Sequence, residues 1–131
     1  FVGEATSGQV NRFITNSPAG ELATSHWARV EFSSMLDRQV RTNYMDRSAA
    51  LAVDEQLDHF LRRSFTVYLP TSDDFDLARR YLGHHDTGLR GGDALHLAIA
   101  ANRRVEAIHT LDKTMLKAGT EFGLPVSAGI R

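Results

Sequence analysis

An α/β fold with a parallel sheet flanked by helices is the class that this sequence predicts. Short β-branched stretches alternate with amphipathic segments along the chain, which is the pattern of strand–helix–strand units. The chain has 131 residues, about the length of one domain, and 42% of them are hydrophobic. No internal repeat, low-complexity segment or linker interrupts the pattern. We therefore expect a single domain over residues 1–131.

In the first half of the chain, capping residues and apolar periodicity define the elements. Ser7 can cap a first helix, Ser25 a second, and Asp46 or Ser48 a third, because their side chains can accept from free N–H groups of a first turn. The side of the second helix that we expect to face inward carries Trp27, Val30, Glu31, Ser34 and Met35. The expected elements are a helix at 9–14, a strand at 22–24, a helix after residue 25, a helix from 46 or 48 to about 62, and a strand at 65–69.

In the second half, breakers and charges mark the boundaries. Pro70 ends the strand, and Asp73 and Asp74 stand where a helix begins and its dipole favours negative charge. Residues 94–101 are apolar on nearly every side, so that helix should be buried. Gly119 should stop the last helix. The expected elements are a helix from 72 to 82, a glycine-containing loop at 84–92, a helix at 93–102, a strand at 105–111, a helix at 113–118 and a strand at 125–128.

Charge and cysteine content exclude several function classes. Lys and Arg number 15 and Asp and Glu number 16, so the net charge is −1 and a uniformly basic nucleic-acid coat is excluded. The chain has no cysteine, which excludes a disulfide framework and a thiolate metal site and suits a reducing cytoplasm. No apolar run is long enough for a membrane span. We expect a cytoplasmic protein without a membrane segment.

Most acidic residues fall on helix faces that we expect to be solvated. Asp54, Glu55 and Asp58 lie among polar residues of the third helix. Arg62 stands four residues after Asp58, a spacing that suits an exposed ion pair. These acids are therefore expected to serve solubility and local pairing.

Three other carboxylates depart from that pattern. Glu31 falls on the expected inward side of its helix, Asp93 opens a buried helix, and Asp112 ends a strand, where α/β folds place their sites. Each also has a structural alternative: Asp93 and Asp112 as helix N-caps, and Glu31 at the edge of an amphipathic face. Together they offer oxygen ligands to one region, which is the ligand set of Mg²⁺ or Mn²⁺.

The segments around these acids resemble a known family. Residues 89–98 (LRGGDALHLA) resemble the third-acid motif of PIN-domain ribonucleases, notably the VapC-type toxins of bacterial toxin–antitoxin pairs. Residues 108–113 (IHTLDK) are similar to the fourth-acid motif, and residues 23–34 (ATSHWARVEFSS) to the second-acid helix. The order and spacing of the three segments agree with that family over nearly the whole chain.

The resemblance implies a three-layer PIN-like fold and metal-dependent cleavage of RNA. Glu31, Asp93 and Asp112 would be the catalytic carboxylates and would hold one or two Mg²⁺ or Mn²⁺ ions that orient a water for in-line attack. Thr110 would support the site by hydrogen bonding, and Arg90, nearest to it in sequence, would contact RNA phosphate. The implied partners are an RNA substrate, a cognate antitoxin protein and a second copy of the chain in a homodimer.

One feature of the family has no counterpart in this sequence. The family carries its first acid as Asp-x-Ser/Thr at the end of an N-terminal strand, whereas residues 1–4 (FVGE) resemble the segment that comes directly after that strand. We therefore expect a PIN-like domain without its first strand. This leaves open an alternative function, a catalytically impaired binding or scaffold module. A structure-specific DNA nuclease of the same superfamily is less favoured, because 131 residues leave no room for its helical arch.

Two other patterns have ordinary explanations. Asp86-Thr87-Gly88 matches the tripeptide of aspartic proteases, but it comes after two histidines in a loop, so a turn is expected. No two of the six histidines are spaced to share one helix face as zinc ligands, so zinc is not expected.

Overall fold

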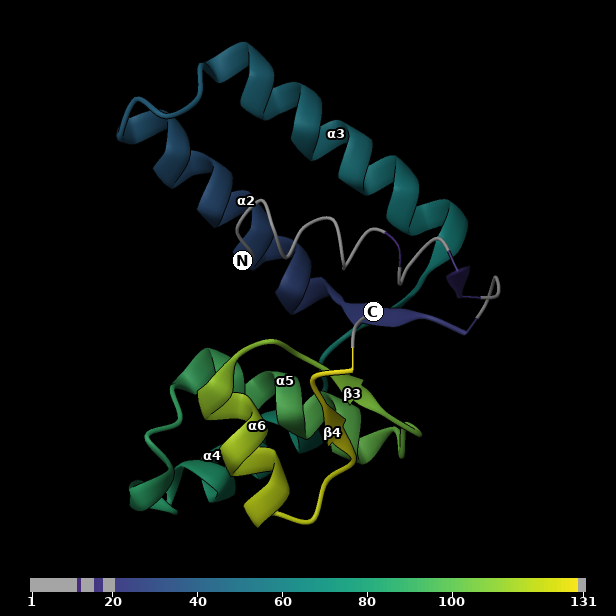
Figure 1. The fold of residues 1–131 in the computed structure, drawn as a ribbon, viewed down its shortest axis with the longest axis vertical. Helices are drawn as coiled ribbons and strands as arrows, with labels where there is room; N and C mark the ends of the chain where they lie inside the picture. The colour runs from purple at the N-terminus through teal and green to yellow at the C-terminus, as the bar shows by residue number, and fades with distance from the viewer. Residues whose placement is uncertain (1–11, 13–15, 18–20, 130–131) are drawn as a thin grey trace. The chain divides into compact units, whose positions relative to one another are not determined.

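The computed structural model of the chain describes residues 12, 16–17 and 21–129, which divide into two compact units. Residues 16–17 and 21–69 belong to the first unit, and residues 12 and 70–129 to the second. The helix expected at 9–14 lies almost entirely outside the described residues. Each unit contains one pair of parallel strands together with several helices (Figure 1). The expected α/β class with parallel strands and flanking helices is thus confirmed.

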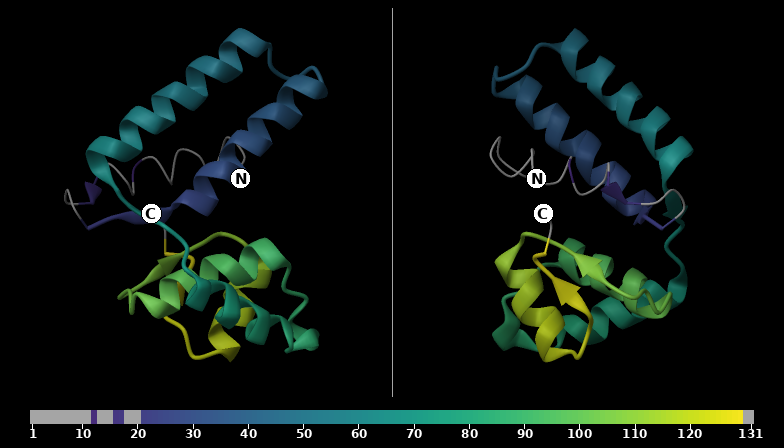
Figure 2. Two further views of the ribbon diagram at one scale, coloured as in Figure 1. Left: turned by 180° about the vertical axis from the view of Figure 1, so that it is seen from behind. Right: turned by 45° about the vertical axis from the view of Figure 1, so that its right-hand side comes forward.

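The first unit is a pair of parallel strands joined by two long helices. The elements are, in order, β1 (Ala23–Ser25), α2 (His26–Arg41), α3 (Arg47–Ser64) and β2 (Thr66–Tyr68). Ala23 pairs with Thr66 and Ser25 with Tyr68. A parallel pair needs a long crossover, which α2 and α3 provide by lying side by side and antiparallel (Figures 1 and 2).

The start of each long helix is decided locally. Ser25 Oγ accepts a hydrogen bond from the Ala28 N–H at 3.1 Å, and Asp46 Oδ1 accepts one from the Ala49 N–H at 2.7 Å. Each side chain satisfies an N–H group that has no partner within its helix. The N-caps expected at Ser25 and Asp46 are confirmed, and Ser48 lies one residue inside α3.

The second unit packs helices around a second parallel pair. Its elements are α4 (Ser72–Leu82), the short 3₁₀ helix η1 (His85–Thr87), α5 (Gly91–Asn102), β3 (Ile108–His109), α6 (Lys113–Glu121) and β4 (Val126–Ser127). β3 pairs in parallel with β4, and α6 is the crossover between them. The strand expected over 105–111 is shorter, because β3 pairs with β4 over residues 108–109.

The core of the second unit forms around α5, which packs against both α4 and α6. Ala94, Leu97 and Ala98 of this helix are completely buried, as its apolar sequence predicts. Leu97 joins Met115 and Ala118 of α6 in a buried cluster. Partly buried side chains surround that cluster: Tyr81, Leu89, Ile108, Phe122, Leu124 and Val126. At its edge the rings of Tyr81 and Phe122 stack with centroids 4.3 Å apart.

A buried charged group joins α4 to α5. The Asp74 side chain has no exposed surface, and its oxygens accept hydrogen bonds from Arg103 Nη1 at 2.7 and 2.8 Å. Asn102 Nδ2 donates to Oδ1 at 2.7 Å, and the Thr71 N–H donates to Oδ2 at 2.8 Å. The expectation that Asp74 serves only the helix start is therefore incomplete. Its carboxylate also pairs with the C-terminal end of a helix 28 and 29 residues away in sequence.

Gly119 does not stop α6, contrary to expectation. The helix continues through Glu121, and Gly119 is buried within it. A Cβ at this position would overlap the Val126 side chain of β4. The glycine is therefore required for the close approach of α6 to β4, and not for a turn.

Replacing Gly119 by alanine is expected to lower the free energy of unfolding by about 1–3 kcal/mol, because the overlap outweighs the better helix propensity of alanine. Chemical denaturation measures the change. Gly91→Ala is the matched control: Gly91 also lies in a helix and a Cβ there meets nothing within 4 Å. Equal stability of the two variants would contradict the packing role of Gly119. Trimming the overlapping side chain in Gly119→Ala/Val126→Ala should recover part of the loss.

Candidate functional site

Glu31 lies in the second turn of α2 and is half-buried. The expected inward face of this helix is wrong in part, because Val30 is 57% exposed and Ser34 is also exposed. The side of α2 turned to α3 instead carries Arg29 and Ser33, with the buried Leu36 at the i+7 position from Arg29. Glu31 therefore leaves α2 on the side opposite to α3.

Arg29 and Ser33 bind one carboxylate of α3. Arg29 Nη1 donates to Asp54 Oδ1 at 2.7 Å, Ser33 Oγ donates to the same atom at 2.8 Å, and Arg29 Nη2 donates to the Asp54 carbonyl at 3.1 Å. We name Arg29, Ser33 and Asp54 the Asp54 cluster. The hydrogen bond from Arg29 lowers the pKa of the Asp54 carboxyl below its ordinary value, despite the opposing effect of partial burial. Asp54 is thus ionised at neutral pH.

The expectation that Asp54 is merely solvated is wrong, because α2 supplies a cation that the local sequence does not reveal. Asp58 forms both the expected local ion pair and a contact with α2. It pairs with Arg62 at 3.0 Å, as its spacing predicts, and it also accepts from Arg29 Nε at 3.4 Å. The contact between α2 and α3 therefore includes two ion pairs to Arg29.

Asp93 is the third residue of α5 and is half-buried. The helix begins two residues earlier than expected, at Gly91, and the N-cap is Arg90, whose backbone is extended. The alternative that Asp93 is an N-cap is therefore wrong. Its carboxylate belongs to the first turn, where the helix dipole favours negative charge. Arg90 itself is exposed at the start of this helix.

The loop before α5 is held by local hydrogen bonds. Thr87 is buried, its hydroxyl donates to the His84 carbonyl at 3.0 Å, and it accepts from the Leu89 N–H at 3.2 Å. Gly88 comes next with a φ of 71°, a left-handed conformation that glycine adopts readily. Asp86-Thr87-Gly88 is thus a structural turn, as expected.

Asp112 comes after β3 and caps α6. Its Oδ1 accepts from the Met115 N–H at 2.9 Å, so the N-cap alternative is confirmed. No hydrogen bond to the other oxygen, Oδ2, is found among residues 12, 16–17 and 21–129. Capping therefore uses one carboxylate oxygen, and a role in metal binding would use the other.

Thr110 supports Asp112 through the main chain. Its hydroxyl accepts from the Asp112 N–H at 3.1 Å, and its own N–H donates to the Ser127 carbonyl of β4 at 3.1 Å. The threonine thus links the strand pair to the turn that carries Asp112. The role of Thr110 in supporting a functional site stays a prediction.

The predicted site residues are divided between the two units. Asp93, Asp112, Thr110 and Arg90 belong to the second unit, and Glu31 to the first. Within either unit taken by itself, the described residues contain no group of three His, Asp or Glu side chains that could hold a metal ion. The convergence of Glu31, Asp93 and Asp112 stays a prediction. Their chemistry fits hard divalent cations, since all three are carboxylates.

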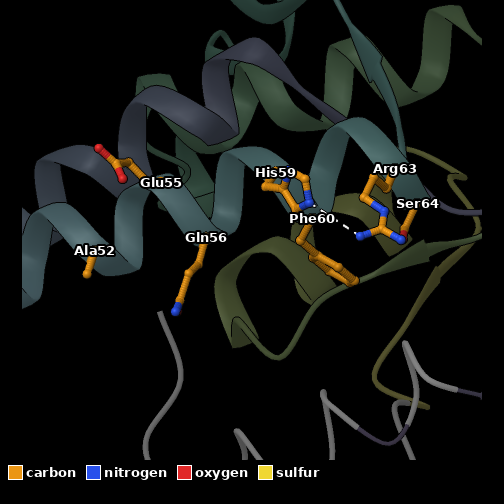
Figure 3. A pocket seen from close by; sticks show the side chains of 7 residues that line it. All are labelled: Ala52, Glu55, Gln56, His59, Phe60, Arg63 and Ser64. Atoms are coloured by element: carbon orange, nitrogen blue, oxygen red, sulfur yellow. Dashed lines mark hydrogen bonds between the residues drawn. The ribbon is translucent and has the colours of Figure 1, made fainter.

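None of the predicted site residues lines a hollow on α3 (Figure 3). Its lining consists of Ala52, Glu55, Gln56, His59, Phe60, Arg63 and Ser64. Glu55 is the one carboxylate among these, and Arg63 lies 3.3 Å from the His59 ring. This mixed lining is unlike an acidic metal centre.

The comparisons with known proteins concern the chain as a whole. In the part of the chain that the structure describes, no helix is both long and apolar enough to cross a membrane. A search of the curated proteins found no match. A family model described as PIN domain matches residues 2–120.

Proposed function

This chain belongs to the PIN domain family, and on that basis we propose that it is a Mg²⁺- or Mn²⁺-dependent endoribonuclease, the toxin of a type II toxin–antitoxin pair. PIN domains are typically metal-dependent nucleases, and PIN nucleases bind RNA. The family thus supports phosphodiester hydrolysis in general. The proposal adds the toxin role and the residues that perform the reaction.

The observation that carries the proposal is the environment of Asp112. A carboxylate at the end of a parallel strand keeps one oxygen without a hydrogen bond among the described residues, while its main chain is held by Thr110. The carboxyl ends of parallel strands are where α/β folds place their sites. Asp93, in the first turn of α5, belongs to the same unit.

In the proposed mechanism, Glu31, Asp93 and Asp112 hold the divalent cation. The bound cation would supply activation of a water and stabilisation of charge on the scissile phosphate. Thr110 restrains the main chain at Asp112, and the Asp112 bond to α6 fixes the carboxylate rotamer. Arg90, exposed at the start of α5, pairs with an RNA phosphate through its planar fork of donors.

The proposed partners suit an acidic site in a chain that has no basic coat. An antitoxin would cover the acidic site with a basic side chain, and the toxin would form a homodimer in the cytoplasm. Because the net charge of the chain is −1, RNA binding would depend on local arginines and on the bound cation, not on a basic coat.

The direct test is cleavage of a structured RNA by the purified chain. We expect cleavage with Mn²⁺ or Mg²⁺ and none in excess EDTA, with recovery when the metal is restored. Induced synthesis of the chain should arrest bacterial growth, which tests the toxin role separately. RNA that is bound but not cleaved at any metal concentration would contradict the nuclease and support the scaffold alternative. Cleavage without growth arrest would contradict only the toxin role.

A further inference from the structure

The Asp54 cluster contains more contacts than an ordinary surface ion pair. Arg29 and Ser33, one turn apart on α2, both donate to Asp54 Oδ1, and Arg29 also donates to Ser33 Oγ at 2.7 Å. The Arg29 and Asp54 side chains are 18% and 33% exposed. By contrast, Asp37 and Arg41 of α2 form a pair that is 66% and 65% exposed and, among the residues that the structure describes, joins no second element. The Asp54 cluster thus restrains α2 at two points against α3.

From this geometry we propose that Asp54 is a positioning residue for Glu31, an inference that rests on the nuclease function proposed above. Glu31 is the residue midway between Arg29 and Ser33 in sequence. At about 100° per residue, it projects roughly 160° away from both. The bonds on one side of α2 therefore set the direction in which the Cα–Cβ bond of Glu31 leaves the other side.

Metal ligands have to be positioned accurately, so the restraint on α2 is relevant to metal binding. Ligating groups have to be held within about 0.5 Å and 10–20° of their working geometry. A side-chain end lies about 6 Å from a helix axis, so a rotation of about 20° displaces it by roughly 2 Å. Such a displacement is as long as a Mg²⁺–oxygen bond, about 2.1 Å, and would remove the ligand. Loss of the Asp54 cluster is thus expected to weaken metal binding, although the cluster supplies no metal ligand.

The test compares Asp54→Ala with Asp37→Ala, an acid of α2 whose partner is on its own helix. Mn²⁺ binding is measured by calorimetry, and RNA cleavage is measured across a Mn²⁺ titration. For Asp54→Ala we expect the Mn²⁺ concentration at half-maximal cleavage, and the Mn²⁺ Kd, to rise by about 10–100-fold. Asp37→Ala should leave both unchanged. Ser33→Ala, which removes a single bond to Asp54, provides a milder variant if Asp54→Ala does not fold.

A double-mutant cycle identifies the route of the effect. In a Glu31→Gln background the metal ligand is already lost, so Asp54→Ala should cause no further rise in the half-maximal Mn²⁺ concentration. A general loss of stability would lower the amount of active enzyme equally in both backgrounds. Suppose that wild type cleaves RNA with Mn²⁺ and that Glu31→Gln needs more Mn²⁺ than wild type. If Asp54→Ala then resembles Asp37→Ala, the positioning role is overturned and the nuclease stands. If wild type neither binds Mn²⁺ nor cleaves RNA, the proposed function fails, and the positioning role with it.

Discussion

Replacing Asp74 by alanine is expected to lower the free energy of unfolding by about 3–5 kcal/mol, because the change leaves the mostly buried Arg103 cation without the carboxylate that it pairs with. Asp74 accepts four hydrogen bonds, from Arg103, Asn102 and Thr71, and has no exposed surface. The Arg103 side chain is 19% exposed, so water can replace only part of the hydrogen bonding that it loses. Urea denaturation at neutral pH measures the effect.

A neighbouring acid is the control for this prediction. Asp76 lies on the same helix and is exposed, so Asp76→Ala should change the free energy of unfolding by less than about 0.5 kcal/mol. Similar losses in both variants would show that Asp74 has no special role. A combined Asp74→Ala/Arg103→Met variant should recover part of the stability, since the cation is removed together with its partner.

The same carboxylate makes stability depend on pH. Burial by itself would raise the pKa of Asp74, but hydrogen bonds from Arg103, Asn102 and Thr71 outweigh it, so the pKa lies below its ordinary value. A group with a lowered pKa in the folded state contributes its stability above the ordinary pKa of about 4. This contribution is lost as the pH falls through the folded-state pKa. Wild type should therefore lose stability more steeply than Asp74→Asn below about pH 4, and parallel curves would contradict the assignment.

Replacing Asp93 by asparagine is expected to reduce metal-dependent RNA cleavage by about 1,000-fold. Asparagine has nearly the same shape but one charge fewer, so it weakens the attraction for a divalent cation that contributes several kcal/mol to the transition state. Because Asp93 lies in the first turn of α5, the exchange should leave the helix intact. Single-turnover cleavage, with the chain in saturating excess over the RNA, measures the loss, and circular dichroism verifies the fold.

Asp73→Asn controls for the loss of a charge at a helix start. Asp73 also stands in the first turn of a helix of the second unit, and it is exposed. Its replacement should leave the cleavage rate within about twofold of wild type. Cleavage by Asp93→Asn at the same rate as by Asp73→Asn would remove Asp93 from the proposed site. Cells that synthesise Asp93→Asn should also continue to grow where the wild-type chain arrests growth.

The starts of α2, α3 and α6 are the part of the fold that local sequence predicts well. Ser25, Asp46 and Asp112 each accept from the N–H three residues ahead. Such contacts are complete within one turn of chain, so a single residue type is enough to indicate them. For the same reason the ion pair between Asp58 and Arg62, four residues apart, could be predicted from its spacing.

Predictions that required knowing a helix's neighbours were less successful. The inward face assigned to α2 was wrong at Val30 and Ser34, because a polar contact with α3 decides which side faces inward. Gly119 has the appearance of a helix stop, yet it lies within α6 where Val126 approaches closely. A glycine signals a turn or a close contact equally well until its neighbour is known.

The sequence by itself determined the family, the order of the elements and the candidate carboxylates Glu31, Asp93 and Asp112, because motif spacing and capping are properties of the chain. Only the tertiary structure decided which acids form ion pairs across elements. Asp54 finds Arg29 25 residues away, and Asp74 finds Arg103 29 residues away. No local pattern distinguishes these aspartates from solvated ones. Their partners are chosen by the packing of α2 on α3 and of α4 on α5, which brings together residues that are far apart in the sequence.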